Sequence, residues 1–198
     1  MTAENSVIAL FPLHAVLFPG GPLPLRIFET RYTDMVRRCM RTGEPFGVLL
    51  IQEGEEAGEV ATTATVGCTA RIADFHTLHD GLLGIACVGE RKFRVQRLWR
   101  AADGLNMGEV QWVPAEPELP LPPEYARLSS AVRRALAELA EHYQHVEKRF
   151  DDAAWVSARL TELLPIEIND KQALLEMEDP IARLAALMAV VPDESSTG

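Results

Sequence analysis

The sequence predicts an α+β protein in which a β-rich first half, residues 1–113, precedes a helical second half, residues 124–198. Twelve of the thirteen glycines lie at or before Gly108, and the last is Gly198. Tight turns and bulges need glycine, whereas its absence favours helix, so this distribution separates the two halves. Five of the thirteen prolines fall in residues 114–123. Because proline lacks an N–H and stiffens the backbone, this stretch is predicted to be a connector.

The first half contains about six segments typical of short strands, separated by turn signals that contain glycine. They cover Val7–Leu13, Phe46–Gln52, Thr65–Thr77, Leu82–Val88, Arg91–Arg100 and Met107–Val113. One short helix is inserted among them, because apolar residues recur at helical spacing between Tyr32 and Met40, and Gly43 supplies a stop. Prolines and paired glycines predict that residues 18–24 form a loop without regular structure. Six strands and one helix favour a small closed or nearly closed barrel.

The second half is predicted to be a bundle of four helices. Apolar residues step by three or four positions from Tyr125 to Phe150, which predicts one long amphipathic helix of about 40 Å. Further helices are expected at about 152–164, at about 169–177, and from Pro180 onward, where Asp179 precedes the proline as a capping carboxylate. We interpret the apolar stripes as the core of the bundle. The alternative for the first helix is a coiled coil that joins two copies in a homodimer.

Composition is that of an ordinary globular protein, with 47% hydrophobic residues and a formal net charge of −10. The charge is uneven, since residues 1–113 hold 11 basic and 13 acidic groups and residues 114–198 hold 8 and 16. No apolar stretch approaches the roughly 18 residues that span a membrane, and the N-terminus shows no basic leader, so a cytoplasmic protein without membrane contact is expected. Three cysteines without a CxxC pair predict buried thiols rather than disulfides or a zinc cluster.

Motifs for nucleotide binding and hydrolysis are missing, since the sequence has no Walker A loop, GxGxxG, GxSxG or HExxH. His76 and His79 lie near two aspartates, but residues three apart on a strand point to opposite faces, so a polar hairpin tip is favoured over a metal site. His142 and His145 would share a helix face without a third ligand. We therefore predict no catalytic residues, no metal and no cofactor.

Two features could recognise a macromolecule. Arginines and one lysine cluster on the inserted helix and on the strand at 91–100, which permits nucleic-acid binding, although the strand splits its cluster between two faces and the net charge opposes a polyanion. The segment LFPGGPLPLRIF, residues 17–28, instead concentrates apolar side chains where a helix cannot form. Some of them are expected to seal the core, and the others to offer an apolar surface to extended polypeptide. The candidate polypeptide-binding residues are Phe18, Leu23, Leu25, Ile27 and Phe28.

Five segments together resemble the N-terminal domain of the Lon ATP-dependent proteases, whose relatives include stand-alone bacterial proteins and the Lon-like domain of cereblon. They are FPLHAVLFPGGPLPLRIFETRYTDMV, FGVLLI, VGCTARIADF, DGLLGIACVGERKFRV and LTELLPIEINDKQALLEMEDPIARLAALMAVV. The resemblance implies a PUA-like six-stranded pseudo-barrel followed by a helical bundle, which together make one Lon N-terminal-type domain.

The resemblance also implies recognition of protein substrates or partners. It implies no catalysis, since the ATPase and Ser-Lys protease modules of Lon lie beyond this domain. The expected function is therefore a non-catalytic polypeptide-binding module with an adaptor or substrate-recognition role in proteolysis. The alternative is RNA or other nucleic-acid binding, which some PUA-like folds perform.

Overall fold

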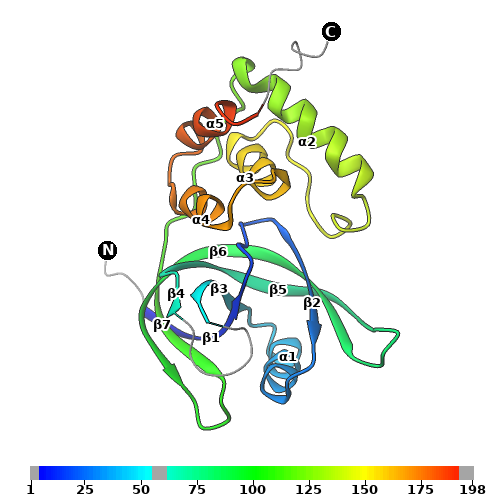
Figure 1. Ribbon diagram of the computed structural model, residues 1–198, viewed down its shortest axis with the longest axis vertical. Helices are drawn as coiled ribbons and strands as arrows, with labels where there is room; N and C mark the ends of the chain where they lie inside the picture. The colour runs from blue at the N-terminus through cyan, green and yellow to red at the C-terminus, as the bar shows by residue number, and fades with distance from the viewer. Residues whose placement is uncertain (1–4, 55–61, 192–198) are drawn as a thin grey trace. The chain divides into compact units, whose positions relative to one another are not determined.

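A computed structural model describes residues 5–54 and 62–191, which fall into two compact units. The first unit spans Met1–Ala115 together with Glu141–Val146, and the second spans Glu116–Ala140 together with Glu147–Gly198. Strands dominate the first unit and helices the second (Figure 1). The predicted mixture of strands and helices is confirmed. Within the described residues, no helix has both the length and the apolar composition that crossing a membrane requires.

The described part of the first unit holds one sheet of seven strands. The strands are β1 (Asn5–Leu13), β2 (Pro22–Ile27), β3 (Phe46–Glu53), β4 (Thr62–Thr63), β5 (Val66–Thr77), β6 (Leu83–Arg100) and β7 (Asn106–Trp112). Neighbouring strands in the order β1-β7-β6-β5-β3-β4 are antiparallel. In addition, β1 pairs in parallel with β3, the fifth strand of this order. Five strands therefore form a closed ring of pairings, β1-β7-β6-β5-β3, while β2 pairs only with β6.

The interior of this unit is filled by side chains from the ring and from α1 (Thr30–Thr42). Phe11 stacks on Tyr32 of α1 with ring centroids 3.8 Å apart, and Phe46 lies 6.1 Å from Phe11. The predicted stripe of α1 is confirmed for Tyr32, Met35, Val36 and Cys39, which are buried, whereas Met40 is 43% exposed. Gly43 ends the helix with a φ of 74°, the left-handed conformation that its predicted role as a stop requires. Figure 1 shows α1 at one end of the strands, next to β2.

Two predictions about the strands are wrong. The segments at 82–88 and 91–100 form one continuous strand, β6, whose 18 residues carry β5 along one edge and first β2, then β7, along the other. The segment from Pro22 is a strand rather than an irregular loop. Proline is tolerated there because β2 is an edge strand, and only one of its two edges has to supply hydrogen bonds to the sheet.

The second unit contains α2 (Ala126–Glu138), α3 (Ala153–Leu163), α4 (Ile168–Glu176) and α5 (Pro180–Met188), preceded by a 3₁₀ turn at Pro123–Tyr125. α3 contacts each of the other three α-helices. Two of these helices begin at a capping aspartate. The side chain of Asp152 accepts a hydrogen bond from the backbone N–H of Trp155 at 3.1 Å, and that of Asp179, as predicted, accepts one from the backbone N–H of Ile181 at 2.8 Å.

The long helix predicted from Tyr125 to Phe150 is wrong, because α2 ends at Glu138 and turns follow. Tyr143 and Val146 are buried, and their segment, 141–146, groups with the strand unit rather than with the helices. Apolar spacing alone predicts burial at these positions but not which part of the chain buries them. The helix face predicted to hold His142 and His145 is therefore absent, since both lie in these turns.

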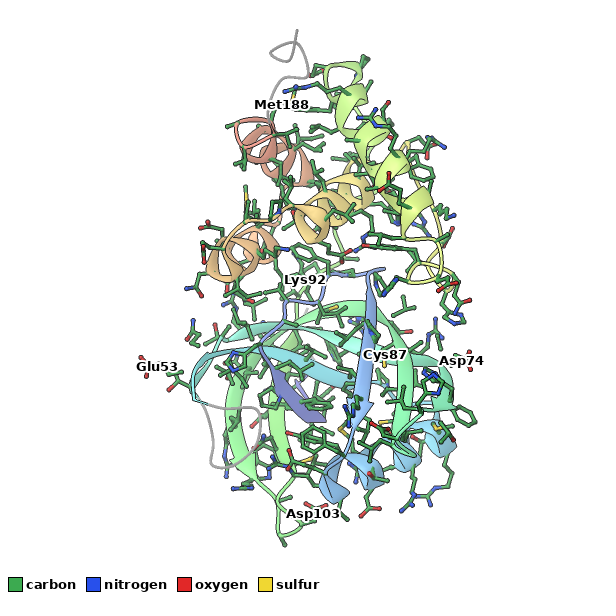
Figure 2. The ribbon with its side chains drawn as sticks, turned by 45° about the vertical axis from the view of Figure 1, so that its right-hand side comes forward. Glu53, Asp74, Cys87, Lys92, Asp103 and Met188 are labelled. Atoms are coloured by element: carbon green, nitrogen blue, oxygen red, sulfur yellow. The ribbon has the colours of Figure 1, made fainter. Side chains whose placement is uncertain are left out.

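All three cysteines are buried, as predicted, and each is a thiol in the structure. Figure 2 shows Cys87 among the side chains of the strand unit. Burial raises the pKa of the Cys87 thiol from its usual 9.0 to about 12, and the nearby Cys39 adds to the rise while Arg71 opposes it. Burial also raises the pKa of Cys39. Both thiols are therefore poor nucleophiles in the folded protein.

The raised pKa of Cys87 predicts that the folded protein becomes less stable at alkaline pH. Above pH 9 the unfolded chain releases the Cys87 proton while the folded chain retains it up to about pH 12, so the free energy of unfolding must fall as pH rises through this window. For Cys87 alone the slope is about 1.4 kcal/mol per pH unit. Urea unfolding of wild type and Cys87→Ala at about pH 8 and about pH 10.5 measures it. The wild type should lose more stability than the variant, and equal losses would contradict the assignment.

Candidate apolar binding site

The candidate site lies where the ring of strands has an opening. β7 pairs with β1 only as far as Leu10, so Phe11 and Leu13 of β1 lie past the end of that pairing. β2 and β7 share the edge of β6 opposite β5, with β2 paired to Leu83–Val88 and β7 to Phe93–Arg100. The outer edge of β2 is therefore not joined to β1. A pocket of about 320 Å³ lies between them.

Most of the pocket lining is apolar. Its walls come from β1 and the positions just after it, from β2 and the two residues that follow it, and from the first turn of α1. The lining residues are Phe11, Leu13, Ala15, Leu23, Pro24, Leu25, Arg26, Ile27, Phe28, Glu29 and Tyr32. The volume falls at the small end of the range of about 300–1,000 Å³ that is typical of ligand pockets. It suits one or two large side chains rather than a whole folded partner.

The five predicted binding residues divide between this pocket and the core. Leu23, Leu25, Ile27 and Phe28 line the pocket. Phe28 is 62% exposed, and Leu23 and Leu25 are half-buried. Ile27 is nearly enclosed, since only 2% of it is exposed. Phe18 is 1% exposed and is not part of the lining, so the structure places it in the core, which is the sealing role that the sequence allowed for part of this segment.

The segment before β2 is held by a tight turn and by β6. The N–H of Gly21 donates to the carbonyl of Phe18 at 3.0 Å, and Gly20 adopts a φ of 71°. Gly20 donates to the carbonyl of Gly89 at 2.7 Å, while the N–H of Gly89 donates to the carbonyl of Gly21 at 2.9 Å. The paired glycines therefore fasten the start of β2 to β6, which explains why this segment is ordered without being helical.

The two charged residues of the lining both have partners. A guanidinium nitrogen of Arg26 lies 2.6 Å from a carboxylate oxygen of Asp80, and Arg31 lies 2.9 Å from Glu29. Arg31 is buried and also donates to the carbonyl of Gly104 at 3.1 Å. The pocket thus presents no charge that lacks a counter-ion within reach. Such a lining favours an uncharged occupant, because a charged one would lose water without gaining a free partner.

The histidines at the hairpin do not form a metal site in the described residues, where no group of three potential ligands comes together. His76 is exposed, and its ring lies over Gly84 of the neighbouring strand, within 2.7 Å of the position of a Cβ atom there. Asp80 is engaged by Arg26 and also accepts from the N–H of Leu82 at 3.0 Å. Asp74, at the periphery of the strand unit in Figure 2, lies 3.8 Å from His145.

Several members of the basic clusters are occupied by contacts inside the protein. On α1, Arg31 is buried and Arg37 pairs with Asp34 at 3.0 Å. On β6, Arg91 stacks over Trp112 with its guanidinium 4.3 Å from the ring centroid. These contacts give the arginines structural roles that the sequence pattern alone does not distinguish from nucleic-acid binding.

Sequence reasoning did not find the other walls of the pocket. Leu13 is predicted only as part of a strand, and Tyr32 only as part of the buried face of a helix. Their proximity to β2 depends on the closure of the ring, which joins β1 to β3 and β7 over long distances in sequence. Local apolar patterns carry no signal for such a closure.

Comparison with known families gives one match over most of the chain. Residues 7–191 match the family model described as the ATP-dependent protease La (LON) substrate-binding domain. A crystal structure of a Lon N-terminal domain protein from Xanthomonas campestris is 41% identical, covers 94% of this chain and 99% of that one, and superposes with a TM-score of 0.77. The N-terminal domain of the Lon protease of the Mycobacterium avium complex shares the fold at 17% identity, with 93% and 97% coverage and a TM-score of 0.61.

The curated relatives are longer proteins. The Lon protease of Cytophaga hutchinsonii is 23% identical over 195 residues, which are 94% of this chain and 24% of that protein. Protein cereblon of Xenopus tropicalis is 29% identical over 127 residues, which are 63% of this chain and 27% of that protein. The chain thus spans about a quarter of the length of these relatives.

Proposed function

Because the chain belongs to the family of the ATP-dependent protease La (LON) substrate-binding domain, we propose that it binds extended or unfolded polypeptide through the pocket beside β2. In this proposal the chain is a non-catalytic, cytoplasmic module that recognises substrates or partner proteins and acts as an adaptor in their proteolysis. Its strand unit acts as a PUA-like pseudo-barrel, and the prolines of residues 114–123 connect it to the helical bundle. The family match supports a substrate-binding role, and the apolar lining of the pocket supports the proposed location.

One observation carries the proposal: an apolar pocket lies open beside an exposed phenylalanine. An apolar pocket with exposed apolar side chains in its lining is typical of interaction sites, and Phe28, which is 62% exposed, belongs to this lining. An unfolded polypeptide differs from a folded one chiefly in exposing such side chains. A pocket for one or two apolar groups would therefore select unfolded chains over folded ones. The paired charges of the lining support polypeptide over nucleic acid, since phosphate would need free cations.

Substitution of Phe28 by serine is expected to weaken polypeptide binding about tenfold, because burying a phenylalanine contributes roughly 1.5–3 kcal/mol and a tenfold change is about 1.4 kcal/mol. Phe75→Ser is the matched control, since Phe75 is 55% exposed on β5 and does not line the pocket. Fluorescence anisotropy with a labelled, alkylated and denatured globular protein measures both affinities. The control is expected to stay within about twofold of wild type.

Equal behaviour of the two variants, or no binding by wild type, would count against the proposal. The role in proteolysis is tested with the same proteins. Wild type added to the ATP-dependent protease of the same cell should change the degradation rate of the denatured probe, Phe75→Ser should do the same, and Phe28→Ser should not. Labelled single-stranded RNA, used in place of the polypeptide, reports the nucleic-acid alternative through a salt-dependent affinity.

A further inference from the structure

The prolines of β2 determine which hydrogen-bonding groups face the pocket. Residues 22–27 pair with residues 88–83 of β6 in an unbroken antiparallel register. In such a ladder alternate residues turn their N–H and C=O groups toward the partner strand, and the others turn theirs away. Pro22 and Pro24 have no N–H to give, so the groups that bond β6 belong to Leu23, Leu25 and Ile27.

The outer edge of β2 therefore carries acceptors almost alone. The backbone groups directed away from β6 are the carbonyls of Pro22, Pro24 and Arg26 and the N–H of Arg26. Within residues 5–54 and 62–191, no other strand pairs with this edge. All three residues lie at or directly before the pocket, since Pro24 and Arg26 belong to its lining.

An edge of this kind is poorly matched to a second copy of itself, because against three carbonyls each copy could offer only the N–H of Arg26 as a donor. It matches instead a chain that brings N–H groups, and an extended polypeptide presents one at every second residue along an edge. The neighbouring pocket is apolar and its charges are paired, as Arg26 is with Asp80 and Glu29 with Arg31. A ligand that matches both the edge of β2 and the pocket is thus an extended backbone with free N–H groups and an uncharged side chain.

We propose that an extended segment of an unfolded polypeptide lies along the outer edge of β2, donates alternate backbone N–H groups to the carbonyls of Pro22 and Pro24, and inserts one uncharged apolar side chain into the pocket. This mode rests on the proposed function and adds to it a rule for substrates. The backbone contacts are independent of side-chain identity, while the pocket asks only for one uncharged anchor. The protein should therefore bind many different polypeptide sequences, provided that each contains one apolar side chain for the pocket.

The test uses the acetylated, amidated nonapeptide GTVTFTVTG and two N-methylated forms, one methylated on the third and fifth residues and the other on the fourth and sixth. Since alternate N–H groups face opposite edges, one form should bind the full-length chain about tenfold more weakly and the other within about twofold of the parent. Replacing the central phenylalanine by aspartate or lysine should each weaken binding at least about tenfold, because the lining has no free counter-ion. Isothermal titration calorimetry measures all five peptides.

Equal effects of the two methylation patterns, or no effect of either, overturn the edge mode. If Phe28→Ser still weakens the parent peptide in that case, binding at the pocket stands and only the backbone recognition is wrong. If wild type binds the denatured protein but not the nonapeptide, the edge mode is likewise overturned. If it binds neither, the proposed function fails with it. A lysine-anchored peptide that binds as tightly as the parent contradicts the uncharged anchor alone and leaves the methylation result to decide the edge.

Discussion

Arg183→Met is expected to lower the free energy of unfolding by about 3–5 kcal/mol, the cost of breaking a buried ion pair on one side. Arg183 is 1% exposed, and its guanidinium meets both carboxylate oxygens of Glu116, at 2.9 and 2.5 Å. Its Nε donates to the hydroxyl of Ser157 at 3.0 Å, and its other nitrogens reach the carbonyls of Met177 at 3.2 Å and Ala154 at 3.4 Å. One side chain thereby links α5, α3 and the segment that leads into the helical unit.

The size of the effect comes from the charge that the substitution leaves behind. In Arg183→Met the carboxylate of Glu116, only 13% exposed, loses the guanidinium that bonds both of its oxygens, so its charge is poorly compensated in a nearly buried place. The double variant Arg183→Met with Glu116→Gln should recover part of the loss because it removes that charge. Arg149→Met is the matched control, since Arg149 pairs with Glu118 at 2.8 Å but is 42% exposed, and such pairs contribute about 0–1 kcal/mol.

Urea denaturation followed by far-ultraviolet circular dichroism measures all three variants. A loss in Arg183→Met no larger than that in Arg149→Met would show that the buried network does not stabilise the helical unit. A double variant less stable than the single one would contradict the explanation by stranded charge.

Gly89→Ala is expected to cost about 3 kcal/mol, at the upper end of the range for overpacking. A Cβ atom on Gly89 would lie 2.1 Å from the backbone oxygen of Phe18, a contact that no rotation of a side chain can relieve. The backbone would have to separate, and the two hydrogen bonds that join Gly89 to Gly20 and Gly21 would break. The variant should therefore loosen the attachment of β2 to β6 and weaken polypeptide binding as well.

Gly81→Ala separates the clash from the backbone preference of glycine. Gly81 has a φ of 82° but nothing within 4 Å of its Cβ position, so alanine there meets only the cost of the left-handed conformation, about 1 kcal/mol. Thermal and urea unfolding of both variants measure the difference. If Gly81→Ala destabilises as much as Gly89→Ala, the close approach of Phe18 to Gly89 is not what makes glycine necessary.

The coarse division of the fold could be predicted because it follows from residue types with direct steric meaning. Glycine marks the turns of the strand unit, Gly43 ends α1, and Asp179 caps the helix that it was predicted to cap. Asp152 caps α3, a helix that was predicted to begin at about this residue without a cap being assigned. In each case one residue decides the local backbone through its own φ or its own side-chain hydrogen bond. Local information is then enough.

The candidate site was predicted less well because its elements depend on distant neighbours. The prolines of β2 indicate a break when the chain is considered alone, yet they fit an edge strand once β6 is known to lie on the other side. The apolar spacing that continues past Glu138 predicts more helix, whereas Tyr143 and Val146 serve the strand unit. Sequence therefore identified the apolar character of residues 17–28 but not which of them face solvent.

The closed ring of strands also sets an order of events during synthesis. β1 pairs with β7 from Asn5 opposite Gln111 to Leu10 opposite Asn106, so one edge of the first strand stays open until residues about 100 positions later have left the ribosome. At about 5–20 residues per second that delay lasts roughly 5–20 s. During it Leu10 and Phe11, which end as core residues, can be covered only by α1 and β3, once these elements have been made. During synthesis, this protein, which is proposed to bind unfolded polypeptides, therefore itself exposes apolar side chains as an unfolded polypeptide does.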